Sequence, residues 1–289
     1  MRMRASTPMA AAAAVALGAV VPAAVAGDSP APEVKPSTQS VGQTSRTITP
    51  TWKTFTSASG GGTRIVVSTG GNITGFASPT KTGRNYEHIG VGAVGEGYIL
   101  CYSGSAANYD VGEDSAGFAA PTTTQQAVTR NTLDGRASLV QSFSLTPGGT
   151  AGPSNFLVQM KVVNRTNQTL NNVVIRRQVD FDIDTGGAQG WAGFQSNHSR
   201  TKGTVSAYHD PAEAPAGRES HGIMMMIQTG GTWDTRVTSN ILDTSCDPAA
   251  APTDGNYVSR GDYGDTILWR LGAIPPRGSK TVALRYMRY

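Results

Sequence analysis

The chain has 289 residues, among them 35 glycines and 16 prolines, and only 15% of its residues are charged. Its formal net charge is +4 and it has no dense run of Lys and Arg, so the composition does not predict a nucleic-acid-binding protein. The frequent Gly and Pro residues disfavour long helices and indicate a fold rich in strands and turns.

The first 26 residues have the features of a secretory signal peptide. Arg2 and Arg4 supply a positive start, an Ala- and Val-rich stretch follows, and Ala24-Val25-Ala26 carries the small residues that a signal peptidase recognises. We expect cleavage between Ala26 and Gly27, and therefore a secreted protein of bacterial type. Loss of residues 1–26 removes two arginines and no acid, so the net charge falls from +4 to +2. No later segment is apolar enough to span a membrane.

The remaining chain divides into a linker and one domain. Residues 27–48 are rich in Pro, Ser, Thr and Gly and predict a flexible linker that buries no core. Residues 49–289, about 240 in all, are within the size range of one large β domain.

Short runs of β-branched and aromatic residues recur between turn clusters in this domain. The predicted strands are Arg64–Ser68, His88–Val94, Tyr98–Tyr102, Ala137–Leu145, Asn155–Val163, Val173–Asp184, Thr204–Tyr208, Ile223–Gln228, Thr266–Leu271 and Thr281–Tyr286. Ser105–Gly117 and Asp210–Gly222 are predicted to be long loops. Ten or more strands without a helical stripe predict an all-β fold, an antiparallel two-sheet sandwich.

Cys101 and Cys246 are the only cysteines, and both lie in the exported part. An even number of cysteines in an oxidising compartment favours one disulfide between them. The bridge would close a loop of more than 100 residues, worth about 4–5 kcal/mol on the chain-entropy model. Two separate buried thiols are the alternative.

Two segments resemble parts of secreted bacterial β-sandwich domains, of the immunoglobulin-like or supersandwich type. Val162–Ile175 (VVNRTNQTLNNVVI) resembles their V-x-N-x-T … L-x-N-V-x-V hairpin, and Leu271–Val282 (LGAIPPRGSKTV) resembles their closing turn and strand, with Arg277 interrupting the usual Pro-Gly. The resemblance covers about 30 residues and implies strand pairing and turn geometry. The wide spacing of the two segments is similar to the large supersandwich form found in sugar-binding and polysaccharide-active proteins.

Asp180, Asp182 and Asp184 alternate with apolar residues in the predicted strand Val173–Asp184. In a strand their carboxylates share one face, with Arg176 further back on it, while Phe181 and its apolar neighbours face the core. Three adjacent carboxylates repel one another unless a cation neutralises them, and Ca²⁺ accepts several carboxylate oxygens. Three interpretations stay open: a Ca²⁺ site, pairing with an arginine such as Arg176, or a solvated face.

Trp191 and His221 are candidate ligand-binding residues, together with Arg176. Trp191 lies in a Gly-rich stretch, where an exposed indole could stack on a sugar ring, although most tryptophans are largely buried. His221 precedes an apolar strand, where it could act as a general base, although a single loop histidine is usually structural.

Other catalytic signatures are weak. The chain has no G-x-S-x-G nucleophile elbow. The carboxylates that could include a glycosidase acid/base pair are Glu87, Glu96, Asp110, Glu113 and Asp114, but the separation of such a pair is a property of the folded protein. We therefore predict no catalytic residue from the sequence.

The leading hypothesis is a secreted, non-catalytic β-sandwich that binds an extracellular ligand, with carbohydrate or a cell-surface component as partner. A polysaccharide-active enzyme, either a lyase or a glycoside hydrolase, is the alternative. A structural protein of the cell envelope is the third hypothesis. No cofactor is expected other than the candidate Ca²⁺.

Overall fold

The computed structural model describes residues 50–57, 63–79, 85–89, 95–112, 114–148, 154–181, 183, 196–208, 222–241, 243–251, 257–261 and 263–288. The predicted signal peptide and linker lie outside these residues. Nineteen strands, all paired antiparallel, and no helix occur in the described part of the chain, all within one compact unit, Val41–Tyr289. The described residues also contain no helix with the length and apolarity that crossing a membrane requires.

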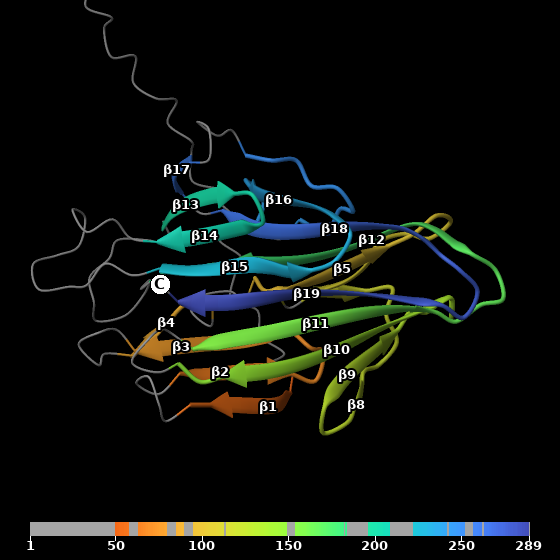
Figure 1. Ribbon diagram of the computed structural model, residues 1–289, viewed down its shortest axis with the longest axis horizontal. Helices are drawn as coiled ribbons and strands as arrows, with labels where there is room; N and C mark the ends of the chain where they lie inside the picture. The colour runs from red at the N-terminus through yellow and green to blue at the C-terminus, as the bar shows by residue number, and fades with distance from the viewer. Residues whose placement is uncertain are drawn as a thin grey trace, which may run out of the picture. The chain divides into compact units, whose positions relative to one another are not determined.

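The largest sheet has nine strands in the order β17-β13-β14-β15-β19-β11-β10-β9-β8. Its strands are β8 (Thr122–Thr123), β9 (Ala127–Asn131), β10 (Ala137–Thr146), β11 (Asn155–Asn164), β13 (Ser196–Thr201), β14 (Thr204–Tyr208), β15 (Gly222–Thr229), β17 (Tyr257–Gly261) and β19 (Ser279–Arg288). Figure 1 shows this sheet in front of the others, with β19 near its middle.

Two smaller sheets form the second layer. The six-stranded sheet has the order β16-β18-β12-β5-β6-β7, and the four-stranded sheet has the order β1-β2-β3-β4. The six strands are β5 (Gly97–Cys101), β6 (Asn108–Val111), β7 (Asp114–Ala116), β12 (Leu170–Asp180), β16 (Thr232–Thr238) and β18 (Gly264–Ile274). The four strands are β1 (Thr51–Thr56), β2 (Arg64–Ser68), β3 (Ile73–Pro79) and β4 (Asn85–Glu87).

One apolar core joins the three sheets. Strand β11 shows the alternation that produces it: Phe156, Val158, Met160 and Val162 are fully buried, while the residues between them are partly or fully exposed. Phe55 of β1 packs on Phe156 with ring centroids 5.1 Å apart. The core also contains inward residues of β12 and β18. The predicted all-β, antiparallel sandwich is therefore confirmed, with its second layer divided into two sheets.

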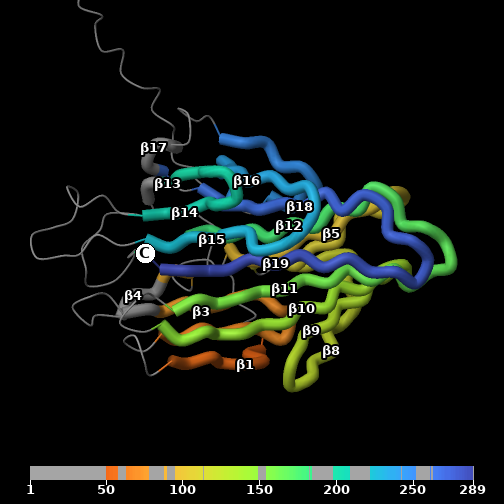
Figure 2. Tube along the Cα trace, viewed as in Figure 1, coloured from red at the N-terminus to blue at the C-terminus, as the bar shows by residue number. Residues whose placement is uncertain are grey.

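The two segments that resemble bacterial β-sandwich domains form crossings between the layers. The first segment was expected to be a hairpin, and this is wrong: β11 and β12 belong to different sheets. The turn after Ile274 likewise leads from β18 into β19 in the opposite layer. Figure 2 shows the two crossings side by side at one end of the sandwich.

Asn164 ties these two crossings together. Its amide Nδ2 donates to the carbonyl oxygens of Gln168, Ile274 and Pro275, and its Oδ1 accepts from Thr166. Arg277, in place of the usual Gly, has a left-handed backbone with φ of 57°. The motif therefore builds a corner of the sandwich, and its Asn supplies the hydrogen bonds that the turning backbone needs.

Some predicted elements differ from the observed ones. The expected strand at His88–Val94 does not begin at His88 or Ile89, which follow β4 as bends, and residues 90–94 lie outside the described part. Ser105–Gly117, expected to be a loop, contains β6 and β7. Strand β12 begins three residues earlier than predicted and ends at Asp180 rather than Asp184.

Candidate functional site

A network of buried polar side chains joins the three sheets around Glu96. Glu96 Oε1 pairs with Arg177 of β12 and accepts a 2.7 Å hydrogen bond from the hydroxyl of Tyr286 of β19. Its Oε2 accepts from the Ile73 amide at 2.6 Å. Burial raises the pKa of Glu96, against the charge of Arg177 and these hydrogen bonds.

Arg177 extends the network towards the turn between β2 and β3. Its Nη1 donates to Gln141 Oε1 at 2.6 Å and its Nη2 donates to the Gly71 carbonyl at 3.1 Å. Gly71 has a φ of 92°, and a Cβ there would lie 2.3 Å from Gln141 Nε2. A glycine is therefore required where this backbone meets the guanidinium and amide groups.

A second buried pair lies beside the first. Asp110 of β6 pairs with Arg130 of β9 and accepts from the amide of Asn72 at 2.7 Å. Tyr98 donates to the Gly70 carbonyl at 2.7 Å. Burial raises the pKa of Asp110, and Arg130 opposes the rise. Glu96 and Asp110, two of the carboxylates considered for acid/base chemistry, are thus buried and ion-paired, which suits them to join the sheets and not to meet a substrate.

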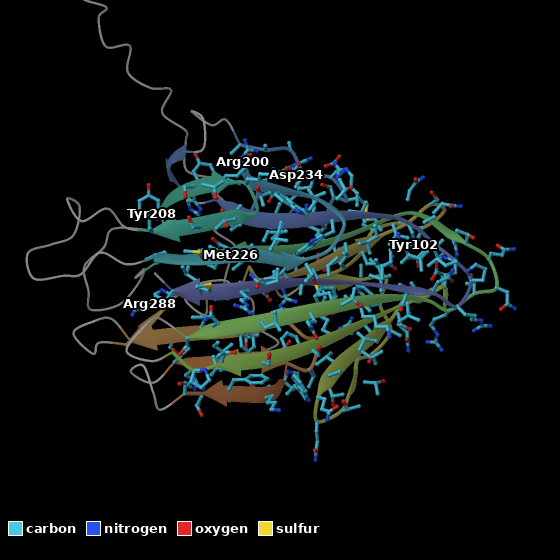
Figure 3. All side chains as sticks on the ribbon, in the orientation of Figure 1. Tyr102, Arg200, Tyr208, Met226, Asp234 and Arg288 are labelled. Atoms are coloured by element: carbon cyan, nitrogen blue, oxygen red, sulfur yellow. A yellow bond between two sulfur atoms is a disulfide. The ribbon has the colours of Figure 1, made fainter. Side chains whose placement is uncertain are left out.

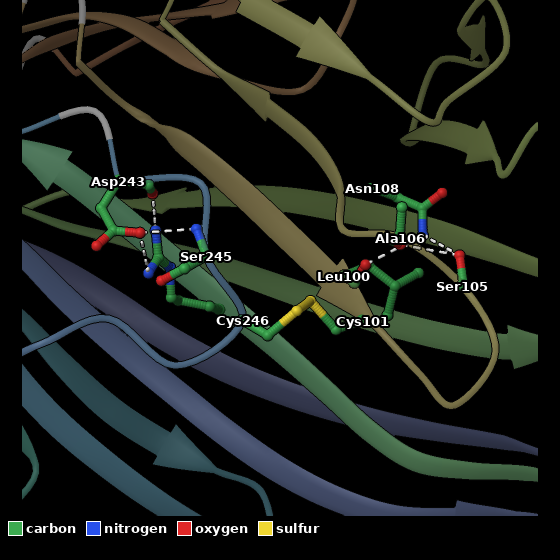
Figure 4. The surroundings of a disulfide bond; sticks show 9 residues. Leu100, Cys101, Ser105, Ala106, Asn108, Asp243, Ser245 and Cys246 are labelled. Atoms are coloured by element: carbon green, nitrogen blue, oxygen red, sulfur yellow. Dashed lines mark hydrogen bonds and ion pairs between the residues drawn. A yellow bond between two sulfur atoms is a disulfide. The ribbon is translucent and has the colours of Figure 1, made fainter.

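Arg176 lies on the outer face of the six-stranded sheet, beneath a covering segment. We call residues 239–241 and 243–251 the strap; Figure 4 shows the part of it that carries Asp243, Ser245 and Cys246. Arg176 is fully buried, donates to the Asp243 carbonyl oxygen and lies 3.6 Å from its carboxylate. Burial lowers the pKa of Arg176 to about 10, although Asp243 favours the charged form. Arg176 therefore anchors the strap to the sheet.

The disulfide predicted between Cys101 and Cys246 is present and fastens the same strap. Cys101 is in β5, Cys246 is in the strap, and their Cα atoms are 5.9 Å apart. Gln178 adds a hydrogen bond from its side-chain amide to the Ile241 carbonyl oxygen. Arg236 and Arg270 both pair with Asp247 of the strap, at 2.6 and 3.2 Å.

Of the three aspartates, only Asp180 is among the described residues, and it is the last residue of β12. Val179, Phe181 and Ile183 are buried as expected, and Asp180 is only 6% exposed, so it is not on a solvated face. Asp182 and Asp184 lie outside the described residues. Within the described part, no three His, Cys, Asp or Glu residues are grouped as metal ligands.

Trp191 and His221 also lie outside the described residues, so their predicted roles stay predictions. The described residue next to His221 is Gly222 of β15, which pairs with Tyr208. Sequence reasoning gave His198 no role, yet it is buried on β13 with Nδ1 3.0 Å from Asp265 Oδ2. Burial raises the pKa of Asp265, and His198 opposes the rise. The pair joins the nine-stranded sheet to the six-stranded sheet.

A groove lies on the surface where β10 extends beyond the end of its neighbour β9. Strand β9 pairs with β10 only along Ser138–Ser142, whereas β10 continues to Thr146. The β8–β9 turn, Thr124–Ala127, lies beside the part of β10 that does not pair with β9. Hydrogen bonds from the backbone amides of Gln126 and Ala127 to Thr124 Oγ1 hold this turn. The groove consists of two shallow hollows that adjoin each other and are open to solvent, with volumes of about 290 and 790 Å³.

The groove is lined by an indole, amides, hydroxyls and one ammonium group. Its lining residues are Trp52, Lys53, Thr123, Thr124, Gln125, Gln126, Ser142, Phe143, Ser144, Leu157 and Gln159. None of these is acidic. Among the described residues that line it, Lys53 alone is charged at neutral pH.

The Trp52 indole is fixed at the edge of this groove. Its Nε1 donates to the Thr124 carbonyl at 2.9 Å, and its ring lies 5.7 Å from that of Phe143, centroid to centroid. Lys53 Nζ donates to the Gln125 carbonyl at 3.2 Å and lies 5.7 Å from the centre of the Trp52 ring. Trp52 is half-buried, so part of its surface stays open to the groove.

Sequence reasoning missed every residue of this groove. The signal that could have found its first part is the segment TWKTFT, which is rich in the β-branched and aromatic residues typical of strands. The step between β9 and β10 depends on strand register, which no local pattern reports.

No family model and no curated protein matches this sequence. Among solved structures, the fold is similar to that of a galactose mutarotase-related enzyme from Lactobacillus acidophilus. The two share 10% sequence identity with a TM-score of 0.37, and the match covers 82% of this chain and 97% of the other. At this score the similarity gives no basis for assigning a ligand or an activity.

Proposed function

We propose that this protein is a secreted β-sandwich that binds an extracellular carbohydrate in the groove between β1, the β8–β9 turn and β10. The observation that carries the proposal is the lining of the groove: three glutamine amides, several hydroxyls and one half-buried tryptophan, without an acidic side chain. The proposed role is binding rather than catalysis.

Such a lining matches the chemistry of a sugar. Sugar hydroxyls donate and accept hydrogen bonds, and the Gln side chain offers both functions in one planar group. Gln125, Gln126 and Gln159 place three such groups on two sides of the groove. An indole presents a broad apolar face for the C–H face of a sugar ring, and the hydrogen bond from Trp52 Nε1 holds that face in position.

Export supports the proposal but is itself part of it. The predicted signal peptide at residues 1–26 would direct the chain out of the cell. The Cys101–Cys246 disulfide is of the kind that persists in oxidising compartments. An extracellular site would meet polysaccharides directly.

The test is binding of a glycan panel by the full chain, purified from a host that exports it. We expect binding that weakens at least tenfold in Gln126→Ala and in Gln159→Ala, since each removes one amide and neither residue is in the core. Gln168→Ala, which removes an exposed amide in the corner turn, is the matched control and should bind like the unaltered protein.

Trp52→Ala should abolish binding. Because this variant also loses a ring that packs on Phe143, the melting temperature of the variant must be measured alongside. Two results would overturn the proposal. Depolymerisation of any glycan would replace binding with the enzyme hypothesis. Absence of both binding and turnover across the panel would favour the structural role.

A further inference from the structure

The nine-stranded sheet has an unusual charge composition. Its nine strands contain no Asp or Glu, but they contain seven basic residues: Arg130, Lys161, Arg200, Arg260, Lys280, Arg285 and Arg288. The six-stranded sheet, in contrast, carries both signs on the same strands, such as Asp234 and Arg236 on β16. The absence of acid is therefore a property of one layer, not of the whole chain.

Some of these basic side chains are engaged inside the sandwich. Arg130 pairs with Asp110, and Arg200 Nη1 donates to the Thr235 carbonyl at 3.4 Å. Arg285 and Lys161 lie on the other face. They alternate with the buried residues of β19 and β11, which places both on the outer face of the sheet. Lys161 is exposed and Arg285 is partly exposed.

The register joins these two cations to the groove. Arg285 stands directly opposite Leu157, and Leu157 and Gln159 line the groove from β11. Lys161 follows Gln159 on the same face, two residues further along. Lys53 stands at the other side of the groove, beyond β10. Two interstrand steps separate β10 from β19, which corresponds to about 10 Å.

The outer face continues past β19 without an acidic side chain. The register of β15 with β19, and of β14 with β15, places Met224, Met226 and Thr204 on this face, and Figure 3 shows Tyr208 on β14 and Met226 on β15. A negatively charged ligand on this face would meet cations, hydroxyls and amides and no opposing carboxylate from the nine strands.

We propose that the ligand of the groove is an acidic polysaccharide, whose chain runs from Lys53 across β10 and β11 to Arg285, with Lys161 beside its path. This inference rests on the proposed function and names its ligand class. The carboxylates of uronate units would pair with the three cations, while the neutral hydroxyls between them would bond the Gln and Ser side chains. Three cations spread among uncharged groups suit a polymer of moderate charge spacing and not the denser phosphates of a nucleic acid.

The probe is an oligogalacturonate, compared with the same oligomer after reduction of its carboxyl groups to neutral hydroxymethyl groups. We expect the acidic oligomer to bind at least tenfold more tightly at low ionic strength, and this preference to decline with added salt. Lys161→Gln and Arg285→Gln together should reduce this preference while leaving binding of the neutral oligomer within about twofold, because neither residue lines the groove.

Arg165→Gln is the matched control, because it removes one exposed positive charge from the corner turn and leaves the groove intact. It should not alter the preference. The acidic and neutral oligomers could bind equally, with both weakened by Gln159→Ala. That result would overturn the proposal of an acidic ligand and leave the proposed function standing. If the protein binds neither oligomer and no other glycan, the proposed function is overturned. Tighter binding of a single-stranded DNA of equal charge would overturn the polysaccharide class.

Discussion

The outer faces of the nine-stranded and six-stranded sheets are used in opposite ways. On the six-stranded sheet, the strap covers Arg176 and Gln178 and is fastened by the disulfide, so these two outward side chains are as buried as the core. On the nine-stranded sheet, the outward residues of β11 stay partly or fully exposed, among them Gln159 and Lys161. Charge follows the same division: opposite charges pair under the strap, whereas the open face carries basic residues alone. A charged side chain in a strand therefore indicates a ligand site only when no other segment of the chain covers that face of the sheet.

The largest expected effect comes from the polar network between the two layers. Glu96→Gln leaves Arg177 charged, fully buried and without its carboxylate, so we expect the free energy of unfolding to fall by about 3–5 kcal/mol. Urea unfolding would measure it. The double variant Glu96→Leu, Arg177→Met should recover part of the loss, because it removes both charges.

The control for the network is Asp114→Asn, which alters an exposed carboxylate on β7. It should change the free energy of unfolding by no more than about 0.5 kcal/mol. If Asp114→Asn lowered the free energy of unfolding as much as Glu96→Gln does, burial would not be the reason that the network stabilises the fold.

The covered face can be weakened separately from the open one. Replacing Cys101 and Cys246 together with Ser removes the covalent anchor of the strap and should cost about 2–5 kcal/mol. Glycan binding should stay unchanged under conditions where the variant remains folded, because no groove residue belongs to the six-stranded sheet or to the strap. Loss of binding by a folded variant would show that the two faces are coupled.

The contact between the layers should respond to pH through Asp265. Burial raises the pKa of this carboxyl in the folded protein above its ordinary value of 3.8. The folded state therefore binds the proton more tightly, and the stabilisation is full below pH 3.8 and is lost as the pH rises through the folded pKa. Relative to Asp265→Asn, the free energy of unfolding of the unaltered protein should fall over this range. A difference that grows with pH would contradict the raised pKa.

The smallest expected effect concerns Ca²⁺ at Asp180, Asp182 and Asp184. If these residues hold the ion as predicted from the sequence, saturating Ca²⁺ should raise the melting temperature by about 2–4 °C over a chelator control, equivalent to about 1 kcal/mol. Asp182→Ala should remove this shift. Identical melting curves with Ca²⁺ and with chelator would exclude a stabilising site.

Local patterns in the sequence predict the apolar strands well. Arg64–Ser68 and Thr204–Tyr208 match β2 and β14 residue for residue, because each is rich in β-branched residues and bounded by turns. Strands β6 and β7 were missed because NYDV and DSA have the composition of a loop. Strand β6 forms by pairing with β5, and β7 forms by pairing with β6. The buried pair of Asp110 with Arg130, which is non-local, fixes β6 further.

The candidate site was less predictable than the fold, for the same physical reason. The outward direction of Arg176 follows from alternation along β12, but its burial depends on the strap, which has no periodic pattern. Cys101 and Cys246 were paired correctly because they are the only two cysteines. The groove arises where β9 stops short of the end of β10, and the lengths of neighbouring strands cannot be read from either strand alone.

The position of β19 has a consequence for the order of folding. This strand, Ser279–Arg288, lies between β15 and β11, which precede it in the chain, and it joins them into one sheet. The corner held by Asn164 likewise needs the carbonyls of Ile274 and Pro275. Pairings so distant in sequence form slowly, because a long loop must close first. The nine-stranded layer therefore stays incomplete until residues 274–288 have emerged, so this layer cannot finish folding before that point.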